Sequence, residues 1–169
     1  MISDSGMMEK KRKPVCNQFV GALFILTLAF LCSQYLWQFA MIQGDSMEPT
    51  IHHMQLVLLD KRTRCFNRGE IIIFRKEGIR GTLIKRVVAE PGDTVQIKEG
   101  QIYVNGNEVS WIDSQTRIES SGRAHDELEM DKNTYFVLGD NVNSSIDSRF
   151  DEIGDVHADD IIGKVITLR

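Results

Sequence analysis

Cysteine is scarce in this chain of 169 residues, and its three copies are poorly placed to crosslink one another. Cys16 and Cys32 lie at the edge and inside of an apolar run, so Cys65 is alone in the rest of the chain. A single cysteine excludes a disulfide within that part, and no cysteine cluster has the spacing of a metal site. The residues directly before Cys32 also lack the small side chains that attachment of a lipid to this cysteine would require.

Positive charge is limited as well, because the formal net charge at pH 7 is −4. Residues 10–13, Lys-Lys-Arg-Lys, meet only Asp4 and Glu9 before the apolar run, which gives this first segment a charge of +2. The remainder of the chain therefore carries a charge of −6. Binding of nucleic acid depends mainly on Lys and Arg that meet phosphate, so this acidic remainder excludes DNA and RNA as partners.

The four histidines form no pattern typical of a metal site. His52 and His53 are adjacent, so on a strand they would point to opposite faces and could not easily chelate one metal. We therefore predict neither a metal nor a cofactor. The composition, 42% hydrophobic and 26% charged, is ordinary for a globular protein and shows no sign of disorder, and the length fits one domain.

The chain is apolar and without charge from residue 19 to residue 42. About 20 such residues span the hydrocarbon core of a bilayer as a helix. The basic cluster before it predicts a cytoplasmic N-terminus, and Tyr35 and Trp37 lie where an aromatic belt would mark the outer interface. We expect a cytoplasmic segment over 1–17, a transmembrane anchor over 18–41 and an extracytoplasmic domain over 42–169. A cleaved secretory signal is the competing interpretation, although its apolar core usually has about 7–15 residues.

The chain after this run consists mainly of short segments with strand-like composition. Polar and apolar residues alternate on both sides of Glu99-Gly100, which predicts a β-hairpin, and Asn105-Gly106 predicts the next turn. The sequence thus favours a mostly β domain of antiparallel sheets, either two small sheets or a partly open barrel. A polar segment at about 105–133 predicts a small accessory lobe. The expected strands are 55–60, 70–75, 82–89, 94–98, 101–104, 134–138 and 161–168.

Two positions have the chemistry of a nucleophile and a base. Ser46 lies in the turn sequence Gly-Asp-Ser-Met-Glu-Pro-Thr at 44–50, shortly after the apolar run. Lys85 lies inside an apolar, β-branched run at 83–89, where burial would lower the pKa of its amine and favour the neutral form that a general base needs. Each also has a plainer interpretation, Ser46 as a turn or N-cap serine and Lys85 as a lysine that reaches water from a sheet edge.

Further motifs follow in order along the chain: Pro-Gly-Asp at 91–93, Gly-Asp-Asn at 139–141 and Ser-Ile-Asp-Ser-Arg at 145–149. Taken alone, the last motif is typical of a polar loop with a capping or Asx-turn role. Together with the Ser46 and Lys85 segments, from about Gly44 to Lys164, these motifs resemble the conserved boxes of the type I signal peptidases. This bacterial leader peptidase family uses a serine/lysine dyad.

The resemblance implies a role for each polar residue of these motifs. Ser46 is implied as the nucleophile and Lys85 as the general base, without histidine. The supporting residues it implies are Ser145, which hydrogen-bonds and orients the lysine amine, Arg86, which pairs with an acid, Asp147, which pairs with Arg86 or Arg149, and Asp140 and Asn141, which brace the turn.

The resemblance also implies a function and a location. It predicts a membrane-anchored serine endopeptidase that removes signal peptides from exported preproteins after small residues, at sites of the Ala-x-Ala type. The implied partners are preprotein signal peptides, the lipid bilayer and the protein-export translocon. The implied place is the plasma membrane, with a single pass and the catalytic domain on the outer face.

The chain departs from the family pattern at two positions. Val142 replaces the arginine that commonly follows Gly-Asp-Asn, so any ion pair at that point is lost. Gly44 replaces a hydroxyl residue that serves many relatives as an oxyanion donor, which leaves the Ser46 N–H and other main-chain donors for that task. In the family the residue after the nucleophile, here Met47, lines the substrate groove, and a flexible core filler is the alternative interpretation.

Three other functions stay open at this point. A self-cleaving repressor-type peptidase also uses a serine and a lysine on a β fold, but it would need an N-terminal DNA-binding domain. A Ser-His-Asp hydrolase would use one of the histidines instead of Lys85. A non-catalytic relative could serve as an assembly factor for surface proteins. The histidines available to the Ser-His-Asp alternative are His52, His53, His125 and His157.

Overall fold

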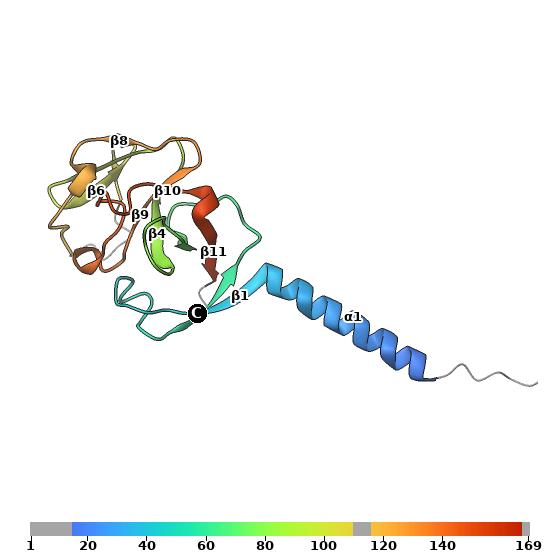
Figure 1. The fold of residues 1–169 in the computed structure, drawn as a ribbon. Helices are drawn as coiled ribbons and strands as arrows, with labels where there is room; N and C mark the ends of the chain where they lie inside the picture. The colour runs from blue at the N-terminus through green and yellow to red at the C-terminus, as the bar shows by residue number, and fades with distance from the viewer. Residues whose placement is uncertain (1–14, 110–115, 167–169) are drawn as a thin grey trace, which may run out of the picture. The chain divides into compact units, whose positions relative to one another are not determined.

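A computed structural model describes residues 15–109 and 116–166, apart from the side chains of 15–18 and 32–34. The chain divides into two compact units, Met1–Tyr35 and Leu36–Arg169. Figure 1 shows one long helix in the first and two sheets in the second. The expected cytoplasmic segment 1–17 lies almost wholly outside the described residues, as do residues 110–115 of the expected lobe.

Helix α1 (Val15–Leu36) forms over the uncharged run, which contains no proline to interrupt its backbone hydrogen bonds. Several of its described apolar side chains, among them Phe19, Leu23 and Phe24, are more than half exposed. Among the side chains that the structure describes, no helix is long and apolar enough to cross a membrane.

The expected anchor 18–41 differs from the structure at its end. Helix α1 stops at Leu36, and β1 (Trp37–Met41) pairs antiparallel with β2 (Leu56–Asp60) over five residues. The second unit therefore begins at Leu36 rather than at residue 42. The ladder pairs one edge of β1, and the Arg62 guanidinium lies 4.4 Å from the centre of the Trp37 ring.

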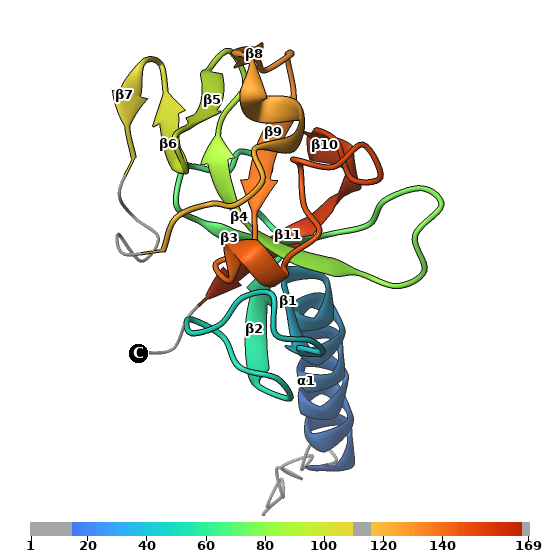
Figure 2. The same cartoon turned by 90° about the vertical axis from the view of Figure 1, so that its left-hand side faces the viewer.

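The second unit is built from two antiparallel sheets, as the sequence predicted. The larger has the strand order β1-β2-β11-β3-β4-β9-β10 and the smaller the order β7-β6-β5-β8 (Figure 2). The other strands are β3 (Ile71–Phe74), β4 (Leu83–Ala89), β5 (Thr94–Lys98), β6 (Gln101–Val104), β7 (Asn107–Glu108), β8 (Leu128–Glu129), β9 (Thr134–Leu138), β10 (Val156–His157) and β11 (Ile161–Ile166). Short 3-10 helices lie at η1 (Gly122–His125), η2 (Val142–Ser144) and η3 (Ala158–Asp160).

Strand β3 lies at the centre of the larger sheet and is buried on both faces. Its sequence, Ile-Ile-Ile-Phe, has no polar alternation, because apolar clusters cover the sheet on each side. Ile71 and Ile73 belong to the cluster that also holds Met47, whereas Ile72 and Phe74 belong to the cluster on the opposite face. This packing makes the middle of the sheet a firm support for β4 next to it.

The smaller sheet corrects the expected boundaries of the accessory lobe. The lobe does not begin near residue 105, because β5 and β6 form its centre and β7 and β8 pair with them from each side. The hairpin between β5 and β6 is confirmed, with the turn at Glu99 and Gly100. A third apolar cluster joins side chains of this sheet to Val88 and Leu138 of the larger one.

All seven strands expected from the sequence are present, with small differences at their ends. The expected last strand, 161–168, is described only to residue 166, where β11 ends. The strands that the sequence did not predict are β1, β7, β8 and β10. Three of them have only two residues each, too short for a periodic pattern, and β1 continues an apolar run without a break.

Candidate active site

Ser46 lies in the turn that connects β1 to β2. The turn is closed at its base by hydrogen bonds from Ile42 N to Gln55 O, 3.0 Å, and from Met54 N to Ile42 O, 2.8 Å. Met47 and Ile51 anchor it, because both are almost fully buried in the cluster beside β3. The turn therefore presents Ser46 half-buried at the surface of a rigid apolar base.

Lys85 reaches Ser46 from β4. Its Nζ donates a hydrogen bond to Ser46 Oγ at 2.9 Å, across 39 residues of sequence. The side chain is only 3% exposed, and this burial lowers the pKa of the Lys85 amine to about 8. The Asp147 and Asp140 carboxylates act against the burial and the Arg149 guanidinium adds to it. A large share of the amine is thus neutral just above neutral pH.

Arg86, the neighbour of Lys85 on β4, pairs with Asp140. Its Nε donates to Asp140 Oδ1 at 2.7 Å, and its Nη2 donates to Asp140 Oδ2. The same guanidinium donates to Gly69 O at 2.8 Å and to Thr50 Oγ1 at 3.2 Å. The expectation that Arg86 pairs with an acid is confirmed, and Asp140 binds this arginine instead of bracing its own turn.

Asp147 and Arg149 form a second, fully buried ion pair. Arg149 Nε donates to Asp147 Oδ1 at 2.8 Å, and its Nη2 donates to Asp147 Oδ2 at 3.0 Å. Arg149 also donates to the carbonyl oxygens of Ser120, Val142 and Ser145. Of the two partners that the sequence allowed for Asp147, the structure thus selects Arg149.

Ser145 is placed beside this group, but its expected bond to the lysine is absent. Within the described part of the chain, Ser145 Oγ is buried and has no hydrogen-bond partner. The hydrogen bond of Lys85 Nζ goes to Ser46 instead. A buried hydroxyl without a hydrogen bond costs free energy. Ser145 Oγ can therefore still take a hydrogen-bond partner in this site.

The Gly-Asp-Asn segment holds the Ser46 turn through its backbone. Asn141 N donates to Ser46 O at 3.0 Å, and Asn141 Nδ2 donates to Asp45 O at 3.3 Å. Gly139 approaches so closely that a Cβ at this position would lie 2.5 Å from Ser46 O. Asn141 therefore does brace a turn, and the turn is that of Ser46.

The departures from the family pattern have physical reasons in the structure. Val142 is 2% exposed and packs in the cluster under the smaller sheet, where an arginine could not be solvated. Gly44 has a φ of +102°, which side chains other than glycine rarely adopt, and its N–H donates to His53 Nδ1 at 3.0 Å. Met47 is 1% exposed, which favours the core-filling interpretation over a place in an open groove.

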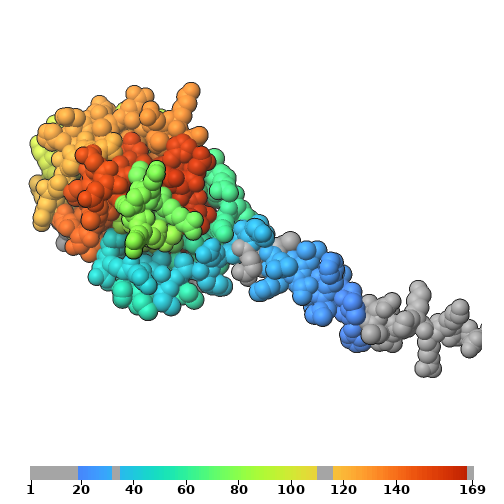
Figure 3. Space-filling model, viewed as in Figure 1, coloured from blue at the N-terminus to red at the C-terminus, as the bar shows by residue number. Residues whose placement is uncertain are grey.

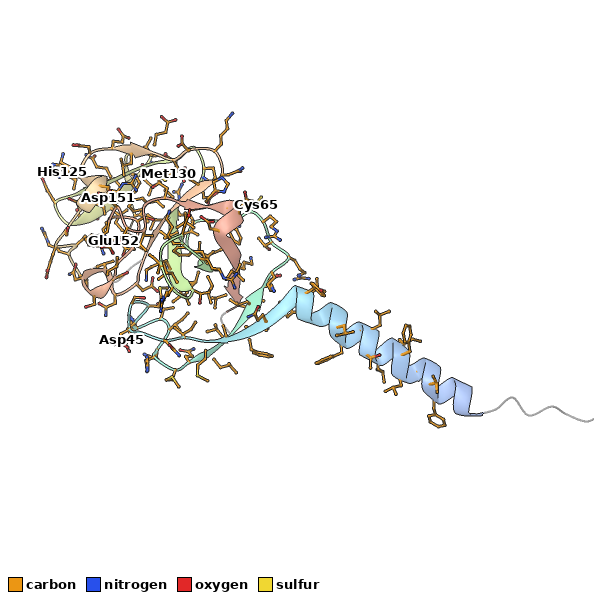
Figure 4. The ribbon with its side chains drawn as sticks, viewed as in Figure 1. Asp45, Cys65, His125, Met130, Asp151 and Glu152 are labelled. Carbon is orange, nitrogen blue, oxygen red and sulfur yellow. The ribbon has the colours of Figure 1, made fainter. Side chains whose placement is uncertain are left out.

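Two of the four histidines, His52 and His53, lie in the Ser46 turn, but the contacts of their side chains go to Glu48 and to the Gly44 N–H. None of the four is hydrogen-bonded to Ser46 Oγ in the part of the chain that the structure describes. His125 belongs to η1, and Figure 4 shows it well apart from Asp45, which marks the Ser46 turn. The described residues also contain no group of three or more His, Cys, Asp or Glu side chains that could hold a metal. The geometry thus favours Lys85 over histidine as the base.

Comparison with known proteins agrees with these motifs. The profile of the family described as signal peptidase, peptidase S26, matches residues 16–168. The chain belongs to this family of signal peptidases. It is a serine peptidase, and the activity of its family is the cleavage of signal peptides. The family assignment thus favours an enzyme over the non-catalytic alternative.

Curated relatives of this signal peptidase cover most of its length. Signal peptidase I P of Bacillus subtilis subsp. natto is 31% identical over 169 residues, 92% of this chain and 89% of that protein. Signal peptidase I of Bacillus licheniformis is 32% identical over 157 residues, 85% of this chain and 84% of that protein. A crystal structure of a signal peptidase I from Enterococcus faecalis V583 has 28% identity and a TM-score of 0.49, and covers 60% of this chain and 97% of that chain.

A cleft in this signal peptidase is formed between the end of β1 and the start of β4, and its lining includes Ile84, the residue before Lys85. It is lined by residues 40–43 at the end of β1, by residues 80–84 at the start of β4 and by Ile73. In Figure 3 the surface of the Ser46 turn, in cyan, borders the green surface around residue 80. The cleft thus ends, on β4, at the residue before the lysine.

Sequence reasoning missed Thr50 and Gly69 as partners of Arg86. Both are distant in sequence, and Gly69 takes part only through its carbonyl oxygen, which leaves no trace in the residue type. The position of Thr50 at the end of the Ser46 motif indicated that it lies near the site. Its contact with Arg86 depends on the fold and could not be predicted from the sequence.

Proposed function

We propose that this signal peptidase cleaves exported preproteins with a dyad in which Ser46 is the nucleophile and Lys85 is the general base. One observation carries the proposal: the buried Lys85 amine lies 2.9 Å from Ser46 Oγ and has its pKa lowered to about 8. A base within hydrogen-bond reach and with a pKa near the working pH is what proton transfer from a serine requires.

Each proton in the reaction has a carrier. Ser46 Oγ attacks the scissile carbonyl carbon while its proton passes to the neutral Lys85 amine, and the carbonyl oxygen becomes an oxyanion. When the carbon–nitrogen bond breaks, Lys85 returns this proton to the leaving amine of the mature protein. The signal peptide then remains bound to Ser46 as an ester.

Water completes the cycle. Lys85, again neutral, takes a proton from a water molecule that attacks the ester carbonyl. The ester bond breaks, the proton passes to Ser46 Oγ, and the signal peptide leaves with a new carboxyl group. The buried ion pairs Arg86–Asp140 and Asp147–Arg149 support this cycle because they fix β4 and the 139–149 segment around the lysine.

The preference for small residues follows from the cleft beside Lys85. In an extended peptide, the first and third residues before the cut point to the same face. Three isoleucines of the cleft, Ile42, Ile73 and Ile84, are each less than a tenth exposed and leave little depth for a side chain. Alanine-like residues would fit there, whereas larger ones would be held away from Ser46.

Membrane anchoring and orientation form a separate part of the proposal. Residues 19–36 hold no charge, and residues 10–13 before them hold four positive charges. On the neighbouring strands β1 and β2, the exposed side chains of Phe39, Met41 and Leu56 share one face, which suits work at a bilayer surface. A cytoplasmic N-terminus would leave the catalytic unit on the outer face of the plasma membrane, where the translocon delivers preproteins.

The first experiment is cleavage of a preprotein with an Ala-x-Ala site by the full chain in liposomes. Wild type should cut, while Ser46→Ala and Lys85→Ala should lose the activity and keep a cooperative unfolding transition. A third variant, Lys98→Ala, removes an exposed lysine of β5 and should cut as wild type does. Full activity of Lys85→Ala would show that the base is wrong.

Anchoring needs its own measurement. We expect the chain to stay in the membrane fraction after alkaline carbonate washing. A protease added outside spheroplasts should then digest the β domain but not residues 1–14. Release of the chain by carbonate, or protection of the β domain, would contradict the proposed orientation.

A further inference from the structure

We propose that Asn141 is a positioning residue that aims the Ser46 N–H at the oxyanion, an inference that rests on the proposed function. Its side-chain Nδ2 donates to Asp45 O at 3.3 Å, and its backbone N donates to Ser46 O at 3.0 Å. Asn141 thus holds the carbonyl groups of both peptide units that flank the Cα of Ser46.

Because the peptide bond is planar, the contact of Asn141 with Asp45 O also orients the Ser46 N–H. The Asp45–Ser46 bond is trans, so its C=O and N–H lie in one plane and point in opposite directions. A donor that fixes the direction of Asp45 O therefore fixes the direction of the Ser46 N–H as well. Glu48 N also donates to Asp45 O, at 3.2 Å, so two donors share this task.

The Ser46 N–H is available for a ligand. In the described part of the chain, no group accepts a hydrogen bond from it. A main-chain N–H next to the nucleophile that is free and held in one direction has the properties of an oxyanion donor. Asn141 and the Glu48 N–H set this direction from the opposite side of the peptide unit, through Asp45 O.

The contact between Asn141 and Asp45 O matters more in this chain because a second hydrogen-bond donor to the oxyanion is missing. Gly44 offers no hydroxyl group, and its own N–H is already bonded to His53 Nδ1. The contribution of the Ser46 N–H then depends on its direction, and a shift of about 1 Å in a reacting group can cost on the order of a hundredfold in rate.

The contact also determines which substitutions are informative. Asp45 O can only accept, so the group that faces it must be the amide NH₂ of Asn141. Asn141→Ala removes the donor, whereas Asn141→Asp keeps the shape and places an oxygen against an oxygen. Asn143 supplies the matched control, since its amide bonds Arg117 O and the Glu119 N–H instead of the Ser46 turn.

The test compares two kinds of ligand on the full chain in detergent. A peptide aldehyde with an Ala-x-Ala end adds to Ser46 Oγ and places its carbonyl oxygen where the oxyanion forms. The matching peptide alcohol binds the same cleft without forming this adduct. Cleavage of the preprotein gives kcat and KM for wild type, Asn141→Ala, Asn141→Asp and Asn143→Ala.

We expect Asn141→Ala to lose about tenfold to a hundredfold in kcat, with KM within about twofold of wild type, and Asn141→Asp to lose more. Affinity for the aldehyde should fall in parallel with kcat, while affinity for the alcohol stays. Asn143→Ala should keep the wild-type kcat and the wild-type affinities for the aldehyde and the alcohol, even if it lowers the unfolding temperature.

Three results would overturn the inference. Asn141→Ala could keep the wild-type kcat, its loss could lie in KM with unchanged aldehyde affinity, or Asn143→Ala could show the same pattern. Each of these results would leave the proposed dyad standing, provided that wild type cleaves the preprotein and that this cleavage depends on Ser46 and Lys85. Wild type without any cleavage would instead overturn the dyad and this inference together.

Discussion

The backbone of Gly139 lies so close to Ser145 that a Cβ at position 139 would come within 2.3 Å of Ser145 Oγ. The same Cβ would lie 2.5 Å from Ser46 O. Glycine is therefore required here by space on two sides, next to the nucleophile and next to the buried hydroxyl beside it. Because of this close approach, the backbone of the Gly-Asp-Asn segment packs directly against the Ser46 turn.

Replacement of Gly139 by alanine should lower both activity and stability. The backbone carbonyl of Ser46 cannot move out of the way by a rotamer change, so the turn itself must shift. We expect a loss of about 1–3 kcal/mol in the free energy of unfolding and on the order of a hundredfold in kcat. Urea unfolding and preprotein cleavage measure the two.

Gly106→Ala is the matched control for this change. Gly106 has a φ of +72°, and a Cβ at this position would meet no atom within 4 Å, so alanine there should cost only about 1 kcal/mol of backbone strain. Its kcat should stay at the wild-type value. A Gly139→Ala enzyme with normal kcat would show that the close approach has no role in placing Ser46.

The pH dependence of cleavage should report Lys85. Burial lowers the pKa of its amine to about 8, and only the neutral amine can accept the Ser46 proton. Below about pH 8, kcat/KM should therefore rise about tenfold per pH unit, and above it the rate should level off. A midpoint near 6.5 that disappears in a histidine variant would instead favour a histidine base.

Lys85→Met should stabilise the protein at neutral pH although it abolishes cleavage. The lysine pKa is lowered from 10.5 to about 8, so the unfolded chain binds more protons between these values. Wild-type stability therefore rises with pH from about 8 to 10.5 and lacks this contribution below 8. After allowance for the lost Ser46 bond, we expect a gain of about 2 kcal/mol at pH 7.

The gain from Lys85→Met should shrink toward pH 10, which urea unfolding at the two pH values can measure. Lys98→Met, at an exposed lysine, should change the free energy of unfolding by less than about 0.5 kcal/mol at either pH. A gain that is equal at pH 7 and pH 10 would mean that burial of charge is not its cause.

The turn between β5 and β6 offers a test of the smaller sheet. Glu99 has a φ of +53° and precedes Gly100 at +78°, a turn in which asparagine is preferred at the first position. Glu99→Asn should therefore raise the free energy of unfolding by about 0.5–1 kcal/mol. The exposed Glu77, whose φ is not positive, is the control, and Glu77→Asn should have little effect.

Several features of this protein follow from its sequence alone. The strands of both sheets were predictable where each has a local apolar pattern bounded by turn residues. The buried character of Lys85 was predictable from the β-branched run around it, and the Glu99-Gly100 hairpin from the alternation on its two sides. Such properties depend on neighbours in the chain, so a single sequence contains them.

The partners of the charged groups were decided by the tertiary structure. Arg86 meets Asp140 and Asp147 meets Arg149, although the sequence allowed Asp147 either arginine. The addition of β1 to the larger sheet likewise depends on β2, which the chain reaches only after the Ser46 turn. The Arg86–Asp140 pair and the β1–β2 ladder join segments far apart in sequence, and local patterns contain no information on which of several equivalent partners will be nearest after folding.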